Sequence, residues 1–478
     1  MPERSFLNSF HTPEMKTISQ LVPVSDPSTV NRGVAVMDGQ IGDWLLCFSD
    51  DLDIPDVPAR LPGMVWKLEC SGDFWQLVRL APDRHWRGSP LTTIRSPEWT
   101  AWLAGELYGT AQPDETVMAL LGGRARADAL NGHFLLLALN RPAGEWHVWT
   151  SRHGTFHAYL AGNGRRVALG TFFPAVAAAS DSHELDWLGL ASFFGFGFFA
   201  SDRTHFSGVR TLQPACHYRF DARGCLMEHE RYWHWRHEPN RTRTYDETLE
   251  EFGGLFGRVM GELTVAGQVA LPISGGLDSR STVAALPGET ASSSRLWAYS
   301  YGFGDDSMET EIARQVARCR GLRFDSFAIG PYLFSSLDRI MAAVEGFEDV
   351  TICRQAAVTD EIDQRSDFLI AAHWGDVFLD DMGLDRASHP VEDLRSFAAR
   401  KFRKRGSDWL LDHLVRTWLG FDPAGALQEL FVTSWERTQQ IDDIDFRFKA
   451  LKTEQWSARW TTVGLRMFQA AAFPRLPF

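Results

Sequence analysis

One short segment, Val269–Ser279, constrains the fold of this chain more than any other feature. It reads as an apolar strand, VALPI, followed by a Gly-Gly turn and a helix that begins near Asp278. A second apolar strand at 296–301 leads to a D-x-x-E capping box, Asp306–Glu309, and a helix to about residue 320. Strands that alternate with helices predict a parallel, doubly wound α/β sheet.

The turn itself has the chemistry of a phosphate-binding loop. Its residues are Ser274, Gly275, Gly276, Leu277, Asp278 and Ser279. Two glycines let successive N–H groups point at an anion, and the following helix adds its positive amino-terminal dipole. The loop lacks the lysine of a Walker motif, so we expect Mg²⁺ to offset the charge of ATP, with Asp278 as a ligand. If this loop is considered without the rest of the sequence, the alternative to a phosphate-binding loop is an ordinary turn between a strand and a helix.

Composition excludes several classes of protein. The 478 residues suffice for two to four domains, and 48 Lys and Arg against 61 Asp and Glu give a net charge of −13. That charge argues against a nucleic-acid partner, and no apolar run reaches the ~20 residues that cross a membrane. The amino terminus lacks a secretory signal, and the six cysteines form no CxxC pair, so we expect a cytoplasmic protein.

The first 235 residues follow a different pattern from the rest. Short strand-like runs are separated by Gly, Pro and Asp, residues 145–149 alternate, and Gly162-Asn-Gly164 is a hairpin signal. This predicts an antiparallel α+β domain over residues 1–235. The polar stretch Arg236–Thr244 is the expected linker, and an amphipathic helix over 245–263 begins the second domain, 245–478.

The motifs together resemble one family. The SGGLDS loop looks like that of enzymes that cleave ATP to AMP and pyrophosphate, and the chain resembles the asparagine synthetase B group, with its β-lactam and lasso peptide macrolactam synthetases. Leu130–Phe134, Ser151–Gly154 and Phe206–Pro214 are similar to the family segments G-x-F, R-D-x-x-G and F-x-G-I-x-x-L-x-P. The resemblance implies an Ntn-hydrolase-like antiparallel sandwich, then an α/β ATP-pyrophosphatase domain with added helices.

The resemblance also implies a second acidic site. In the family, the motif G-x-G-x-D-E supplies a carboxylate that binds Mg²⁺. The matching segment here is His373–Gly383. The match implies that Gly375 lies beside ATP and that Asp376 is the second metal ligand and a catalytic residue. The segment is one residue shorter than the family pattern and has Val377 where a glutamate is usual. We expect the neighbouring Asp380, Asp381 and Asp385 to lie in a solvated acidic loop or helix cap.

Upstream, Val344–Arg354 resembles the family segment I-E-T-Y-D-x-T-T-I-R. The match makes Glu345 the candidate base that helps an amine or ammonia attack the acyl-adenylate. The alternative is that Glu345 is a surface helix residue beside Glu348 and Asp349.

Two features depart from the family. Glutamine-hydrolysing members use an amino-terminal cysteine, but position 2 is Pro2 and the earliest cysteine is Cys47, so we expect no glutaminase activity. The segment Ala472–Phe478 resembles R-x-P-F-L-D but stops before the aspartate, and the lysine-bearing part that follows in relatives is missing. A truncated, split or inactive protein is therefore among the expectations.

The leading hypothesis is an AMP-forming carbon–nitrogen ligase that uses ATP and Mg²⁺ to adenylate a carboxylate and transfers an amine or ammonia. Its expected partners are a small-molecule or peptide substrate and, if the chain is split, a partner protein. Intramolecular or peptide amidation is favoured over asparagine formation. The alternative is a non-catalytic or partner-dependent nucleotide-binding subunit.

Overall fold

The computed structural model describes residues 42–51, 56–81, 86–163, 165–304, 307–373, 375–379, 401–415 and 422–477. Its elements in the first half are β1 Trp44–Ser49, β2 Trp66–Ser71, β3 Trp75–Leu80, β4 Leu91–Arg95, β5 Trp99–Leu107, α1 Pro113–Leu121, η1 Ala127–Ala129, β6 Gly132–Asn140, β7 Glu145–Thr150, β8 Tyr159–Gly162, β9 Arg166–Gly170, α2 Phe173–Ser180, α3 Trp187–Phe196, β10 Val209–Thr211, β11 Cys216–Phe220 and β12 Leu226–Arg231.

The elements of the second half are α4 Tyr245–Thr264, β13 Val269–Pro272, α5 Leu277–Ala285, α6 Gly288–Ala291, β14 Leu296–Gly302, α7 Met308–Cys319, β15 Phe324–Ala328, α8 Tyr332–Ser335, α9 Leu337–Val344, η2 Val350–Ile352, η3 Arg354–Val358, α10 Thr359–Arg365, β16 Phe368–Ile370, α11 Gly375–Leu379, α13 Ser407–Trp409, η4 Leu410–Val415, α15 Pro423–Glu429, α16 Val432–Glu436, α17 Ile444–Lys452, η5 Thr453–Thr461, α18 Thr462–Gln469 and β17 Phe473–Arg475. The elements η1 to η3 are 3₁₀-helices, and η4 and η5 are π-helical.

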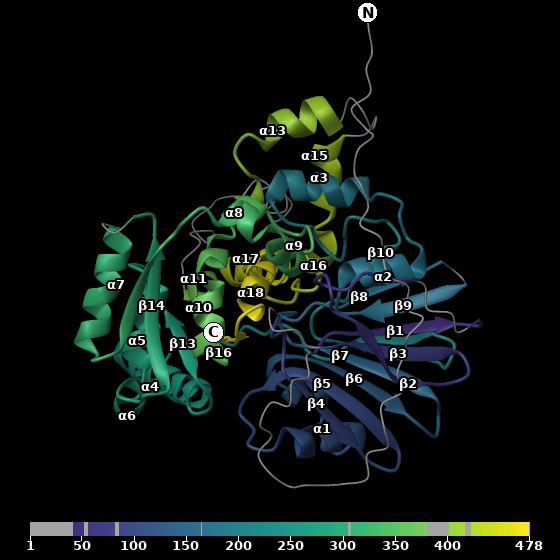
Figure 1. The fold of residues 1–478 in the computed structure, drawn as a ribbon, viewed down its shortest axis with the longest axis horizontal. Helices are drawn as coiled ribbons and strands as arrows, with labels where there is room; N and C mark the ends of the chain where they lie inside the picture. Colours follow the sequence, from purple (N-terminus) through teal and green to yellow (C-terminus); the bar gives the residue numbers. More distant parts are fainter. Residues whose placement is uncertain are drawn as a thin grey trace, which may run out of the picture.

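The first half is a sandwich of two antiparallel sheets. Their strand orders are β10-β8-β9-β1-β3-β2 and β12-β11-β7-β6-β5-β4, and the two sheets lie face to face in Figure 1. Large aromatic side chains fill the space between them, with Trp75 edge-on to Trp146 at 4.8 Å and Trp102 stacked on it at 5.8 Å between ring centroids. Truncation of one such buried tryptophan to alanine costs about 3–5 kcal/mol. The predicted antiparallel sheets are confirmed.

The second half contains a five-stranded parallel sheet in the order β15-β14-β13-β16-β17. Along β13, Val269 and Leu271 pack with α4, α5 and α7, whereas Ala270 packs with α10 and α18 on the other face. Both faces are therefore covered by helices, which explains why the strands read as continuous apolar runs. The predicted parallel α/β sheet is confirmed.

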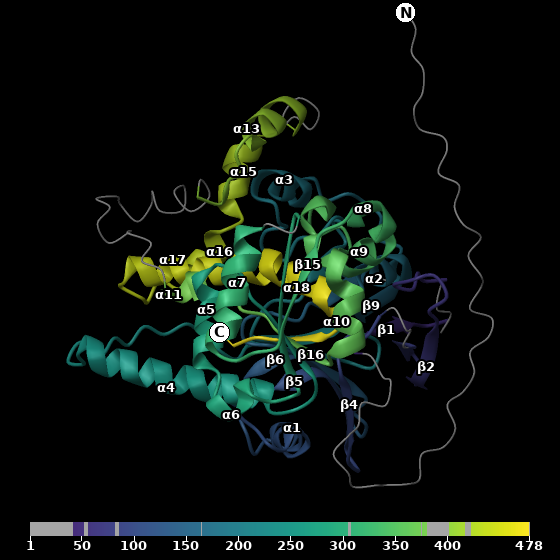
Figure 2. The same ribbon diagram turned by 60° about the vertical axis from the view of Figure 1, so that its left-hand side comes forward.

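Some of the predicted turns and helix starts are confirmed by the structure, and others lie outside the described residues or stay untested. The hairpin signal is confirmed, because β8 and β9 pair on either side of Asn163. The helix expected at 245–263 is α4, which starts at a capping box between Thr244 and Glu247 and projects from the body in Figure 2. The capping box expected at Asp306 falls on a residue outside the described part, and α7 has Ser307 as its N-cap. The domain boundary at 236–244 stays a prediction.

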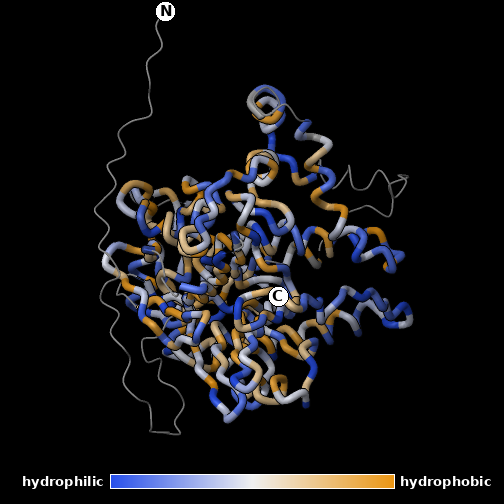
Figure 3. The backbone as a smooth tube through the Cα atoms, turned by 90° about the vertical axis from the view of Figure 1, so that its right-hand side faces the viewer, coloured by the Kyte–Doolittle hydropathy of each residue, from blue (hydrophilic) through white to orange (hydrophobic). Residues whose placement is uncertain are grey.

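Polar and apolar residues are interspersed through the fold, as the changes of colour along the tube in Figure 3 show. No helix among the described residues is long and apolar enough to span a bilayer. All six cysteines are free thiols, as expected from their spacing.

Candidate nucleotide site

The Ser274–Ser279 loop leaves the carboxyl end of β13 and enters α5. Its two serines close the loop on itself. The Ser274 N–H donates to Ser279 Oγ at 3.0 Å, and the Gly276 N–H donates to Ser274 Oγ at 3.1 Å. The loop is thus held in shape by its own side chains. The first N–H groups of α5 have no acceptor within the helix, so this end is suited to an anion.

The two glycines are not needed for a left-handed backbone. Gly276 has a φ of −71°, and neither Gly275 nor Gly276 has a positive φ. A Cβ at Gly275 would meet the Ile312 side chain at 3.4 Å, and one at Gly276 would lie 3.2 Å from Ser274 Oγ. Our expectation of a tight glycine turn therefore needs another physical reason. Both positions keep the loop free of side chains, so a ligand can approach the backbone closely.

The second predicted segment follows β16. Gly375 is buried and begins α11, and the backbone of Asp376 lies in the first turn of that helix. The Asp376 side chain, Asp380, Asp381 and Asp385 lie outside the described residues. Asp376 thus belongs to the segment that follows β16, and its role as a metal ligand stays a prediction.

These two segments lie at the point where the strand order reverses. β13 is the first strand of the sheet in the chain, and it pairs in parallel with β14 on one side and β16 on the other. Loops that leave the carboxyl ends of β13 and β16 therefore emerge side by side at a topological switch point. Open α/β sheets bind their ligands at such points. Asp278 and Asp376 thus come from neighbouring strand ends.

Exposed apolar side chains and one arginine stand at the starts of α5 and α7 and after β14. Leu277, Phe303 and Met308 are 72%, 66% and 77% exposed. Arg280 is exposed on α5 and donates from Nε to the Gly276 carbonyl oxygen at 3.3 Å. Sequence analysis placed Leu277 in the loop but missed Phe303, Met308 and Arg280, although Arg280 directly follows the loop motif. They offer an apolar surface and a positive charge beside the loop.

Glu345 is not a surface residue. It is 6% exposed and occupies the left-handed region (φ 52°) at the end of α9. Its Oε1 accepts hydrogen bonds from Arg60 at 2.9 Å and Arg466 at 2.8 Å, and its Oε2 accepts one from the Phe173 N–H at 2.7 Å. Both oxygens are therefore engaged in a buried cluster between the two halves. The alternative of a solvated helix residue is wrong, and the assignment of Glu345 as base stays a prediction.

The cluster around Glu345 balances its charges. Arg60 donates two hydrogen bonds to Asp43, and Arg466 also donates to the Tyr159 hydroxyl at 2.8 Å. Burial alone would raise the pKa of Asp43, but the Arg60 guanidinium and its hydrogen bonds lower that pKa overall. Two arginines and two carboxylates form a neutral set, which is the arrangement that makes buried charges tolerable. Nothing in the sequence pattern indicated that Arg60 belongs to it.

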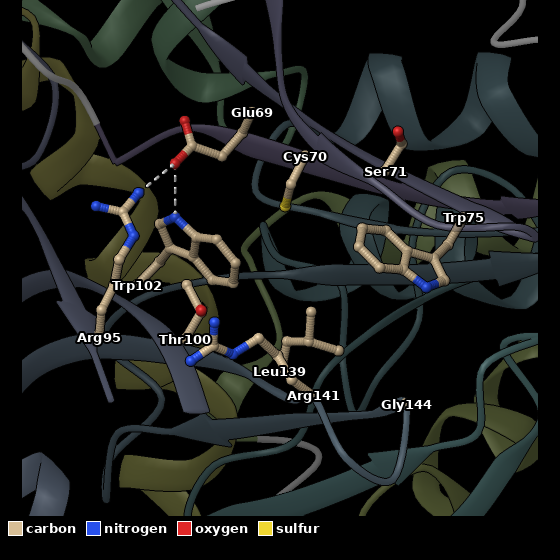
Figure 4. Close-up of a pocket in the computed structure, with 10 residues that line it drawn as sticks. All are labelled: Glu69, Cys70, Ser71, Trp75, Arg95, Thr100, Trp102, Leu139, Arg141 and Gly144. Atoms are coloured by element: carbon tan, nitrogen blue, oxygen red, sulfur yellow. Dashed lines mark hydrogen bonds and ion pairs between the residues drawn. The ribbon is translucent and has the colours of Figure 1, made fainter. Parts of the chain in front are cut away.

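A cavity of about 400 Å³ lies in the first half, away from the loops described above. Figure 4 shows Trp75 and Trp102 at its wall, with Glu69 bonded to Trp102 Nε1 and paired with Arg95. All of its lining residues precede residue 145. It therefore contains none of the residues predicted to bind ATP or metal.

No family model and no curated protein matches the sequence. Similar solved structures include the allosteric regulatory enzyme of purine biosynthesis, at 11% identity over 60% of this chain and 75% of that chain, with a TM-score of 0.24. Glutamine phosphoribosylpyrophosphate amidotransferase from B. subtilis, complexed with ADP and GMP, has 11% identity over 60% of each chain and a TM-score of 0.23. Glutamine-dependent NAD⁺ synthetase from Acinetobacter baumannii, in complex with ADP, has 14% identity over 55% of this chain and 62% of that chain, with a TM-score of 0.21. Similarity at these TM-scores carries no conclusion about fold or function.

Proposed function

We propose that this chain is an ATP-dependent, amide-forming synthetase of the asparagine synthase type. A substrate carboxylate attacks the α-phosphorus of ATP, the bond to the β-phosphate breaks, and pyrophosphate leaves. An amine or ammonia then forms a C–N bond to the acyl carbon, and AMP leaves with the former carboxylate oxygen. ADP is not a product of this sequence.

One observation carries the proposal. A lysine-free Gly-Gly loop and a second acidic segment follow β13 and β16, the two adjacent strands at the switch point of a parallel sheet. The lack of a loop lysine disfavours a γ-phosphoryl transfer of the Walker type. The paired strand ends support a site for a polyphosphate with its metal ion.

Each group of residues has a separate role in the proposed reaction. The backbone N–H groups of the Ser274–Ser279 loop and of Gly375 bind the phosphates, and Leu277, Phe303 and Met308 offer an apolar surface for the base. Carboxylates are suitable Mg²⁺ donors, and Asp278 and Asp376 would hold the ion, which neutralises polyphosphate charge when bound. Catalysis would come mainly from holding the carboxylate and the α-phosphate in line.

In this proposal the first half is a retained scaffold without glutaminase activity, because Cys47 lies inside β1 and is therefore not an amino-terminal nucleophile. A chain that takes its amine directly from the substrate, as in peptide or natural-product biosynthesis, has no use for glutamine hydrolysis. The assignment of the amine step to Glu345 stays a prediction.

The test is isotope exchange between labelled pyrophosphate and ATP. The purified chain is incubated with Mg²⁺, ATP, labelled pyrophosphate and a panel of amino acids, dicarboxylic acids and peptides. We expect exchange with at least one acid, and AMP rather than ADP when methylamine is added. Formation of ADP would contradict the proposal, and ATP binding without exchange for any acid would favour a non-catalytic nucleotide-binding subunit.

The variant Asp278→Ala should lose Mg²⁺-dependent ATP binding in calorimetry and lose exchange. Asp246→Ala is the matched control, because Asp246 is also an aspartate in the first turn of a helix but is exposed on α4. Equal ATP binding by both variants would remove Asp278 from the site.

A further inference from the structure

Glu348 is a buried carboxylate, and one of its oxygens lacks a hydrogen-bond partner in the part of the chain that the structure describes. It follows α9 by four residues and is 7% exposed. Its Oε2 is inaccessible to solvent and has no hydrogen-bond partner among the described residues. Glu345, three residues earlier, has both oxygens satisfied by the Arg60–Arg466 cluster. The same segment therefore contains one carboxylate that is fully bonded and one that is not.

A buried carboxylate oxygen without a hydrogen-bond partner is costly to fold, because it loses its contacts with water and no donor replaces them. Burial, followed by the nearby charge of Asp349, raises the pKa of Glu348 to about 7, and Lys404 opposes this only in part. Such a group is suited to receive a cation or a proton near neutral pH.

There is also space beside this carboxylate. Gly464 in α18 faces it, and a Cβ placed on Gly464 would lie 3.7 Å from Glu348 Oε2 and 3.9 Å from Oε1. A glycine inside a helix costs about 1 kcal/mol relative to alanine. Here the glycine leaves the volume of at least a methyl group open next to the charged oxygens.

Two elements next to this carboxylate, α18 and the segment that ends at Arg354, interact with residues near the edge of the sheet that holds the Ser274–Ser279 loop. One helical turn after Gly464, Phe468 packs against His373, which follows β16, with ring centroids 6.1 Å apart. Arg354, the first residue of η3, is within electrostatic range of Tyr301 near the carboxyl end of β14. The elements on either side of Glu348 therefore interact with residues at or just after the carboxyl ends of β14 and β16.

We propose that Glu348, rather than Glu345, binds the protonated amine of the second substrate and accepts its proton. This inference rests on the proposed amide-forming function. The ammonium gives one proton to the Glu348 carboxylate, and the neutral amine forms the C–N bond with the acyl carbon of the adenylate. The C–O bond to AMP breaks, AMP leaves as its phosphate dianion, and the second proton lost by nitrogen goes to water.

The first test needs no knowledge of the acid. Thermal unfolding is followed with methylammonium chloride and, separately, with sodium chloride at equal concentration. We expect methylammonium to raise the Tm of the full chain more than sodium does, and this difference to disappear in Glu348→Gln. Glu289→Gln, an exposed glutamate on α6, is the matched control and should keep it.

The variant Gly464→Ala leaves the carboxylate in place and fills the space beside it. It should also lose the methylammonium effect, so the idea remains testable if Glu348→Gln does not fold. A methylammonium effect that is absent from the parent chain, or that persists in both variants, would overturn the proposal.

The second test separates this inference from the proposed function. With an acid that supports pyrophosphate exchange, Glu348→Gln should lower amide formation relative to exchange by about 10²-fold or more, the size of a general-base contribution. An unchanged ratio would overturn the role of Glu348 while leaving the proposed function intact. Absence of exchange in the parent chain would overturn the proposed function itself, whatever the methylammonium result.

Discussion

The carboxylate of Glu345 accepts hydrogen bonds from two arginines that belong to different halves of the chain, Arg60 and Arg466. Because all three side chains are buried, removal of one charge leaves the others uncompensated. We expect Glu345→Gln to lower the free energy of unfolding by about 3 kcal/mol. Urea denaturation followed by fluorescence measures this change directly.

Glu289→Gln controls for the loss of a glutamate and should change the unfolding free energy by less than about 0.5 kcal/mol. If Glu345→Gln is as stable as the parent chain but fails to form the amide, the buried cluster is not its main role. The assignment from the family resemblance would then be favoured.

Glu348 should make stability depend on pH in a defined window. Its pKa is about 7 in the folded protein against an ordinary value of 4.5, so between these values the folded chain binds more protons than the unfolded chain. Stability must therefore fall as the pH rises from about 4.5 to about 7. The parent chain should lose about 3 kcal/mol over this window relative to Glu348→Gln.

The comparison with the variant isolates this residue from its neighbours. Asp349 and Cys353 on the same segment, and Lys404 before α13, are the titratable groups in electrostatic contact with Glu348. They are present in both proteins, so their own titrations largely cancel. If the stability difference between the parent chain and Glu348→Gln stays constant from pH 4 to pH 8, Glu348 is ionised and has a partner. That result would contradict the description of its Oε2 as an oxygen without a hydrogen-bond partner.

At the scale of the element, Gly276 in the Ser274–Ser279 loop allows a test of phosphate binding. Its φ suits alanine, but the added Cβ would lie 3.2 Å from Ser274 Oγ and project into the open side of the loop. We expect Gly276→Ala to weaken ATP binding about tenfold, or about 1.4 kcal/mol, with little change in stability. Calorimetric titration with Mg²⁺ and ATP gives the affinity.

Gly288→Ala is the matched control, since Gly288 starts α6 and a Cβ there meets nothing within 4 Å. It should bind ATP as the parent chain does. Unchanged affinity in Gly276→Ala as well would mean that phosphate does not approach the loop backbone.

The elements themselves could be predicted because their signals are local. The apolar run Val269–Ile273 and the Gly-Gly turn are enough to place β13 and α5, and α4 follows from its amphipathic period. Helix starts were harder to predict: α4 begins at a capping box between Thr244 and Glu247 that the sequence analysis did not identify. The reason for the loop glycines could not be inferred, since φ is fixed by the surrounding packing.

At the scale of the whole molecule, the features that could not be predicted from the sequence depend on contacts between residues that are far apart in the chain. Arg60 and Glu345 are 285 residues apart, and no motif connects them. Likewise, the burial of Glu348 depends on α18, whose contact through Gly464 is invisible in a local pattern. The sequence could therefore predict the strand and turn that lead into the candidate loop, whereas the hydrogen-bond partners of Glu345 and Glu348 depend on how the halves pack.

Arg475 provides the last prediction, because it ties the end of the chain to both halves. Its guanidinium donates to both carboxylate oxygens of Glu106 on β5, at 2.7 and 2.8 Å, and to the Leu263 carbonyl at 2.7 Å. It also lies 3.4 Å above the Phe368 ring of β16. We infer that the sandwich and the parallel sheet unfold as one cooperative unit, although they read as separate domains in the sequence.

In Arg475→Met the Glu106–Arg475 pair is broken; Arg475 is buried but Glu106 is 24% exposed, so the loss should cost about 2–3 kcal/mol. Hydrogen exchange followed by mass spectrometry of peptides from each half gives one unfolding midpoint for the sandwich and one for the parallel sheet, and both midpoints should fall together. Arg365→Met is the control, because Arg365 pairs with Asp325 where both side chains are more than 40% exposed, and its loss should cost less than about 1 kcal/mol. If only one of the two midpoints moves in Arg475→Met, the halves unfold independently, and the boundary predicted at residues 236–244 separates two autonomous domains.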